Sequence, residues 1–166
     1  MSGRICAAVQ SGRRLFVIAA FFAALAFSAL TASEVIAEEC AEGMTTRRAA
    51  VLYDGPSASA GERLILEAHY PLRRIGFVSG WCKVLLPGGE NGWVRAKLVR
   101  RLRAAMAHSG GAIARADPGD SAPGVFYAKS GVVMEVLGRA RPGWFQVLHL
   151  DGETGYVAAG EVWVNF

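Results

Sequence analysis

Two cysteines and three histidines outside the N-terminal segment are the side chains best suited to nucleophilic attack or metal binding: Cys40, Cys82, His69, His108 and His149. A thiol nucleophile needs a base within hydrogen-bond reach. Cys82 shares strand parity with Val84, so it is predicted to face a core, where a small cysteine is inert. No histidine is placed beside it by the sequence pattern. A thiol-dependent hydrolase is therefore the function that the sequence supports least.

The same residues do not predict a metal site or a bound cofactor. They form none of the short ligand pairs that a zinc site uses. The glycines of PGGENG (87–92) follow one strand and lead into another, whereas a phosphate-binding loop leads into a helix. We expect no cofactor and no metal, and we assign these glycines to a turn.

A disulfide is the remaining possibility for the cysteines. Cys40 and Cys82 could join if the chain is exported to an oxidising compartment, which would restrict the unfolded chain. The inward parity of Cys82 argues against the bridge. The sequence leaves the question open.

The first 37 residues have the order of a secretory signal peptide. Arg4, Arg13 and Arg14 precede an uncharged run, LFVIAAFFAALAFSAL (15–30), and small residues follow. Cleavage after Ala37 would give a mature chain without an integral membrane span, in the periplasm or secreted. A membrane anchor is the alternative, and general secretion and the twin-arginine route both remain open.

Net charge gives no support for nucleic-acid binding. The chain has 18 basic and 14 acidic residues, and removal of residues 1–37 takes away three of the first and one of the second, which leaves 15 minus 13, or +2. Nucleic acid is also a rare partner outside the cytoplasm. Five basic residues between positions 95 and 103 either meet an anionic partner or form a solvated strand edge.

An internal repeat organises the rest of the chain. GWCKVLLPGGENGWV (80–94) aligns without a gap with GWFQVLHLDGETGYV (143–157). Each copy alternates apolar and polar residues, and then has the glycines of a hairpin turn and a second alternating run. Short strands with turns between them predict a small closed barrel. The break at Ser109-Gly110-Gly111 separates the copies.

The order of short motifs resembles the bacterial SH3-like (SH3b) domain family. Gly-Pro-Ser (55–57), Gly-Trp-x-Lys-Val (80–84) and Gly-Trp-Val (92–94) follow the pattern of that family in exported envelope proteins. The resemblance implies an all-β fold of two tandem SH3-like barrels behind a signal peptide. The expected organisation is a signal peptide (1–37), an N-terminal tail (38–44), barrel 1 (45–105) and barrel 2 (106–166).

The second copy departs from this pattern, and the first departs from eukaryotic SH3 domains. Ala-Asp-Pro-Gly (116–119) stands in place of Gly-Pro-Ser, and Tyr156 in place of the tryptophan in Gly-Trp-Val. Val51 to Gly55 begins like a eukaryotic SH3 domain but lacks the second tyrosine, the paired tryptophans and the later proline motif of proline-rich peptide binders. A role as a proline-rich adaptor is not expected.

Five aromatic residues are the candidate ligand-binding site: Tyr53, Trp81, Trp93, Trp144 and Tyr156. If the valines of each repeat point inward, Trp81 and Trp144 are predicted to point outward, with the other rings nearby. Exposed aromatic patches commonly mark contact surfaces. The alternative is that these rings cover barrel ends or pack the barrels together.

The resemblance implies a non-catalytic exported binding or scaffold module of the cell envelope. Its expected partners are peptidoglycan peptides or an envelope protein. The alternative is a structural accessory subunit of an envelope complex. A thiol-dependent hydrolase is the third possibility.

Overall fold

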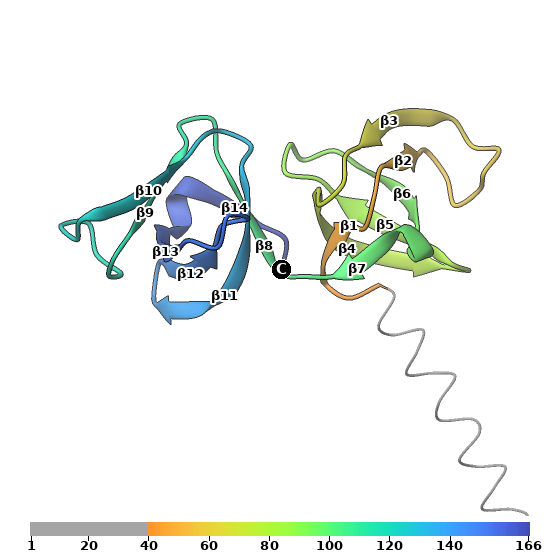
Figure 1. Cartoon of the computed structure of the whole chain (residues 1–166). Helices are drawn as coiled ribbons and strands as arrows, with labels where there is room; N and C mark the ends of the chain where they lie inside the picture. Colours follow the sequence, from red (N-terminus) through yellow and green to blue (C-terminus); the bar gives the residue numbers. More distant parts are fainter. Residues whose placement is uncertain (1–39) are drawn as a thin grey trace, which may run out of the picture. The chain divides into compact units, whose positions relative to one another are not determined.

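The computed structural model describes residues 40–166, which form two antiparallel seven-stranded sheets (Figure 1). The predicted signal peptide and its cleavage site lie outside the described residues. Within the described part, no helix is long and apolar enough to cross a membrane. The prediction of an all-β fold in two repeated units is confirmed.

The first sheet contains the strands of the first repeat. In chain order they are β1 (Gly43–Thr46), β2 (Ala50–Tyr53), β3 (Glu62–Leu66), β4 (Pro71–Val78), β5 (Trp81–Leu85), β6 (Asn91–Arg95) and β7 (Val99–Arg101), with a 3-10 turn η1 (Ala96–Leu98) before β7. Their order in the sheet is β3-β2-β6-β5-β4-β1-β7.

The second sheet has the same connectivity. Its strands are β8 (Ala104–Ala107), β9 (Ala112–Arg115), β10 (Gly124–Ala128), β11 (Val133–Arg141), β12 (Trp144–Leu148), β13 (Thr154–Ala158) and β14 (Val162–Val164), with η2 (Ala159–Glu161) before β14. The order β10-β9-β13-β12-β11-β8-β14 matches the first sheet strand for strand. The sequence repeat is therefore a structural repeat.

Each sheet closes around its own small core. Cys82 and Val84 of β5 are fully buried in the first core, and Val147 of β12 is fully buried in the second. Side chains alternate across a strand, so the inward parity predicted for these positions is confirmed.

A glycine in each repeat allows one strand to pass close to another. A Cβ at Gly92 would lie 2.7 Å from Leu52 Cγ and 2.9 Å from the Tyr53 carbonyl oxygen. At Gly155 it would lie 2.9 Å from the Ala114 Cβ. The glycine of Gly-Trp-Val and Gly-Tyr-Val thus lets β6 approach β2, and β13 approach β9, closing each barrel.

The hairpin turns of the two repeats share one geometry. The Leu86 amide donates to the Glu90 carbonyl oxygen at 2.8 Å, and the His149 amide donates to that of Glu153 at 2.8 Å. Gly89 and Gly152 occupy the left-handed region, with φ of 86° and 96°, which glycine adopts without strain. The assignment of these glycines to turns agrees with this geometry.

The chain passes from the first sheet to the second at Leu102 and Arg103. Strand β8 already pairs with β11 and β14 of the second sheet. Ser109-Gly110-Gly111 is therefore a loop that connects β8 and β9 of that sheet and does not separate the two sheets. The sequence pattern indicated a break there because glycines are the strongest local signal, whereas β8 is short and rich in alanine.

Asn165 joins the two sheets through buried hydrogen bonds. Its Nδ2 donates to the carbonyl oxygens of Met44 at 2.7 Å and Leu102 at 2.9 Å, and its Oδ1 accepts from the Ala104 amide at 2.9 Å. The side chain is fully buried. One amide therefore satisfies three backbone groups, on β1, on β8 and between the sheets.

Arg73 of β4 adds a second connection to the end of the second sheet. Its Nη2 donates to the Val164 carbonyl oxygen at 2.6 Å, and its guanidinium lies 5.3 Å from the Trp163 ring centroid. These contacts hold residues 163–165 of the second repeat against β1 and β4 of the first.

Candidate functional site

The outer face of the first barrel carries three neighbouring aromatic side chains. Tyr53 of β2 is paired in register with Trp93 of β6. The rings of Tyr53 and Trp81 meet edge to face, with centroids 5.3 Å apart. Because β2, β6 and β5 are adjacent, residues separated in sequence form one aromatic surface.

Two basic side chains lie on the same surface. Arg95 is opposite Trp81 in the sheet, and its guanidinium lies 4.9 Å from the indole centroid. Lys83 is opposite Trp93, and its Nζ lies 5.8 Å from that ring. Cations are attracted to the negative face of an aromatic ring. The face is thus both aromatic and positively charged.

Trp81 and Trp144 were predicted to be exposed, but both are buried. They keep only 9% and 7% of their surface accessible. Neither belongs to the core cluster of its barrel, so the predicted parity holds and the predicted exposure is wrong. For Trp81 the reason is that Arg95, on the neighbouring strand β6, and Tyr53, on β2 beyond it, cover the indole.

The second barrel does not reproduce the aromatic surface. Tyr156 is half-buried and faces Arg115 and Gln146, which stand where Tyr53 and Lys83 stand in the first barrel. In the described chain no ring contact joins Trp144 to Tyr156. Tyr53 contacts Trp81 and is paired with Trp93 in the first barrel, whereas Arg115 takes the place of Tyr53 in the second, so Trp144 and Tyr156 lie on adjacent strands without that third ring.

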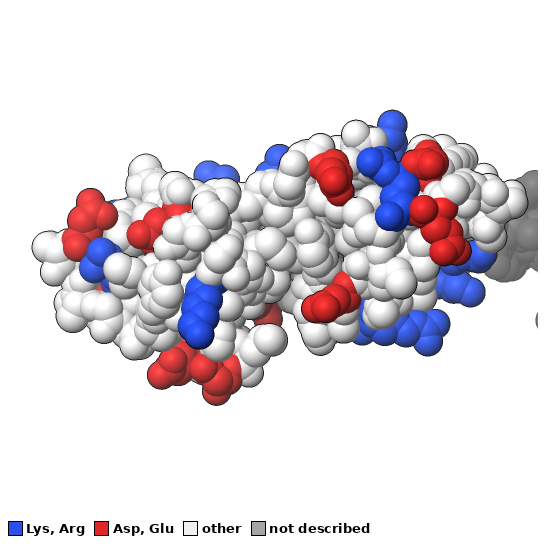
Figure 2. Space-filling view, turned by 90° about the horizontal axis from the view of Figure 1, so that it is seen from above, with Lys and Arg blue, Asp and Glu red and all other residues white. Residues whose placement is uncertain are grey.

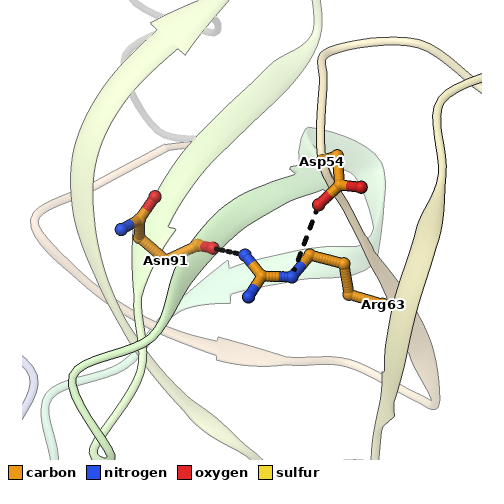
Figure 3. A network of polar contacts seen from close by, with 3 residues as sticks. All are labelled: Asp54, Arg63 and Asn91. Carbon is orange, nitrogen blue, oxygen red and sulfur yellow. Dashed lines mark hydrogen bonds and ion pairs between the residues drawn. The ribbon is translucent and has the colours of Figure 1, made fainter.

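A polar network fixes the loop that begins after Tyr53 (Figure 3). Arg63 of β3 lies between two partners: its Nε is 3.4 Å from Asp54 Oδ1, and its Nη1 donates to the Asn91 carbonyl oxygen at 2.7 Å. The Asp54 amide also donates to the Gly61 carbonyl oxygen at 3.0 Å. These contacts tie the β2–β3 loop to the start of β6, beside the aromatic surface.

Lys83 was missed as a site residue by sequence reasoning, and Arg95 was considered only as one of the five basic residues at 95–103, although the signal for both was present. Lys83 is the lysine of Gly-Trp-x-Lys-Val, and Arg95 lies two residues after Trp93, so both have the outward parity of the aromatics. A Cβ at Gly76 would lie 3.3 Å from the Lys83 Cβ. The small residue on β4 leaves room for the lysine.

Cys82 is bonded to Cys40, and the Cα atoms are 6.1 Å apart. The prediction that inward parity disfavours this bridge is wrong, because Cys40 is itself buried against the first core. A disulfide sulfur is not a thiolate nucleophile. The structure therefore gives the thiol hydrolase no nucleophile at Cys82.

Asp151 and Tyr70 have shifted pKa values, and neither side chain belongs to the aromatic surface. Hydrogen bonds from the Glu153 amide and then from His149 lower the pKa of Asp151. Burial, followed by the nearby charge of Glu90, raises the pKa of Tyr70. In the described residues no three His, Cys, Asp or Glu side chains gather as a metal site would require.

Charged side chains are distributed over both barrels (Figure 2). Blue and red residues are interspersed on the face in view, with uncharged surface between them. This face has no single extended field of one sign. Electrostatic attraction of a ligand to this face therefore depends on the charges near the binding site more than on the net charge of the chain.

Among solved structures, the chain is similar to NlpC2 and NlpC1 of Trichomonas vaginalis and to an NlpC/P60 family protein of Bacillus cereus. It is 14% identical to NlpC2 over 75% of this chain and 48% of that one, with a TM-score of 0.34. It is 16% identical to NlpC1 over 72% of this chain and 44% of that one, with a TM-score of 0.34. It is 12% identical to the Bacillus cereus protein over 74% of this chain and 56% of that one, with a TM-score of 0.33. The chain spans about half the length of these proteins. No curated protein matches it.

Family models match both repeats. Each is described as a bacterial SH3 domain, one matching residues 46–101 and the other residues 110–162. The matched ranges cover the strands of the aromatic surface and their counterparts in the second barrel. The chain belongs to the bacterial SH3 domain family, with two such domains in tandem.

Proposed function

We propose that this chain is an exported, non-catalytic binding module of the cell envelope that holds a peptidoglycan peptide on the first barrel. Bacterial SH3 domains are typically cell-wall binders that act outside the cytoplasm. The proposal that the mature chain begins near Glu38 and lies in the periplasm or outside the cell rests on the leader sequence. The disulfide between Cys40 and Cys82 fits an oxidising compartment.

The observation that carries the proposal is the shared surface of Tyr53, Trp81 and Trp93. Tyr53 and Trp93 are half-buried, so they offer ring surface to a ligand while their edges are held by neighbouring strands. Trp81 lies beneath Tyr53 and Arg95 and supports them. Rigid, partly exposed aromatic side chains are the commonest anchors of a recognition surface.

The second barrel has a different role in this proposal. Arg115 stands there where Tyr53 stands in the first barrel, so the second barrel lacks the third ring of the surface. We assign the principal contact to Tyr53 and Trp93 and a subsidiary contact to the second barrel.

A structural accessory subunit remains the second candidate, because the second barrel also exposes apolar side chains. Ile113, Val125 and Tyr127 are 37%, 45% and 58% exposed, and Tyr127 is paired with Ile113 in register. They lie on β9 and the edge strand β10. A permanent protein partner would cover this surface, and the protein would then copurify with that partner at fixed stoichiometry.

Co-sedimentation of the natural protein with purified cell-wall sacculi tests the proposal. The expected result is saturable binding that free peptide fragments released from the same sacculi compete away. Absence of binding, together with stoichiometric recovery of one envelope protein, would favour the accessory subunit instead.

A further inference from the structure

Each barrel has a surface cleft at an equivalent place, beside its buried tryptophan. In the first barrel the cleft lies between the Ser79-Gly80 turn and η1, and Trp81 forms one wall. In the second it lies between the Pro142-Gly143 turn and η2, beside Trp144. The Gly80 and Gly143 carbonyl oxygens each accept a hydrogen bond at 2.8 Å, from the amides of Ala96 and Ala159. Both clefts therefore have the same backbone frame.

The positive charge beside each tryptophan comes from opposite sides. Across β5 and β6, Trp81 faces Arg95, whereas Trp144 faces Ala158. Across the hairpin on the other side, Trp81 faces Val78 and Trp144 faces Arg141. Each tryptophan therefore has one arginine opposite it, on β6 in the first barrel and on β11 in the second.

A second cation lines each cleft. It is Lys97 in the first barrel and Arg139 in the second. The position that aligns with Lys97 in the second repeat is Gly160. Each cleft thus has two basic side chains, although the sequences supply them from different strands and turns.

These four cations are not neutralised by the protein. In residues 40–166 the ion pairs are Arg63 with Asp54 and His149 with Asp151, so none involves a cleft cation. Lys97, Arg139 and Arg141 are exposed and Arg95 is half-buried. Arg95 and Arg139 contact the rings of Trp81 and Phe145, but within residues 40–166 no carboxylate pairs with any of the four. Two cations without a carboxylate partner, beside an apolar wall, are complementary to an anionic group on a partly apolar ligand.

From this we infer that the chain has two carboxylate-binding clefts, one in each barrel, that recognise the carboxylates of cell-wall peptides. The inference rests on the proposed function, because the wall supplies the ligand. A carboxylate fits the planar fork of an arginine, and the cleft volumes of about 270 and 490 Å³ leave room for a short side chain as well. Occupying both clefts on one wall fragment makes the second contact intramolecular and raises the apparent affinity.

The test compares binding of the full chain to untreated sacculi and to sacculi whose carboxylates have been amidated. One variant changes all four cleft cations to glutamine: Arg95→Gln, Lys97→Gln, Arg139→Gln and Arg141→Gln. A matched control removes four charges outside the clefts: Arg48→Gln, Arg74→Gln, Arg101→Gln and Lys129→Gln. Thermal denaturation confirms that both variants are folded, and pairwise variants of single clefts are measured beside them.

We expect neutralising one cleft to weaken binding about threefold and neutralising both to weaken it about tenfold, as for partly exposed charge pairs. Amidated sacculi should bind the wild type as weakly as untreated sacculi bind the four-cation variant. The matched control should bind like the wild type.

Three outcomes would overturn the inference. If the cleft variant binds like the wild type, the clefts are not used, and the proposed function stands. If charge removal weakens binding but amidation does not, the anion is not a carboxylate, and a phosphate polymer takes its place. If the wild type fails to bind untreated sacculi, the proposed function and this inference fail together.

Discussion

Trp81 is a support for the recognition surface, because its ring is covered by Tyr53 and Arg95. Trp81→Ala should leave a gap beneath both side chains and lower the free energy of unfolding by about 3 kcal/mol or more, as for other buried aromatics. Thermal denaturation measures the loss. Trp93→Ala is the matched comparison, because that ring is only half-buried.

The contrast between these variants separates support from contact. Trp93→Ala should shift Tm much less than Trp81→Ala while weakening ligand binding more at temperatures where both are folded. An equal or smaller Tm shift for Trp81→Ala would contradict the assigned role.

Asp151 makes one hairpin of the second barrel sensitive to acid. Its pKa is lowered in the folded protein, so its contribution to stability is present above its ordinary pKa of 3.8 and is lost as pH falls through the lowered value. Asp151→Asn should reduce Tm at neutral pH, and the gap from the wild type should close as the pH falls below 3.8 through the lowered pKa. A gap that stays constant across this range would exclude the linkage.

At the scale of the strand, Gly92 sets the distance between β6 and β2. Gly92→Ala would place a methyl group against Leu52 and the Tyr53 carbonyl oxygen, which should cost about 1 to 3 kcal/mol by overpacking. Gly88→Ala is the control, because a Cβ there meets nothing within 4 Å. Equal stability of the two variants in chemical denaturation would show that the strands can move apart freely.

Strand periodicity predicted the repeat, the hairpins and the residues that enter each core, because these features depend on local alternation and turn chemistry. It did not predict that Trp81 is covered. The covering side chain of Tyr53 comes from β2, and only the sheet order brings β2 to β6 and β5. The bridge from Cys40 to Cys82 was uncertain for the same reason, since proximity in the fold cannot be read from parity.

At the scale of the whole described molecule, Asn165 connects the two barrels. Asn165→Ala would leave the carbonyl oxygens of Met44 and Leu102 and the Ala104 amide without this partner. Loss of buried hydrogen bonds should lower the free energy of unfolding by about 2 to 4 kcal/mol. Denaturation followed by tryptophan fluorescence measures the change. A variant as stable as the wild type would show that Asn165 does not stabilise the junction.

The disulfide acts on the first barrel. It closes a loop with a sequence separation of 42 residues, so Cys40→Ser with Cys82→Ser should destabilise the chain by about 4 kcal/mol through loop entropy. Reductant should lower the Tm of the wild type and leave that of the double variant unchanged. A wild-type Tm that is insensitive to complete reduction would contradict this role.

Sacculus binding by the variant Tyr53→Ala with Trp93→Ala tests most directly whether these two rings bind the cell wall. Tyr127→Ala, which removes an exposed tyrosine of the second barrel, is the aromatic control. Removing two contact residues should weaken binding about tenfold or more, with the control unchanged and both variants folded at the assay temperature. Full binding by the double variant, or an equal loss in the control, would contradict cell-wall recognition by Tyr53 and Trp93.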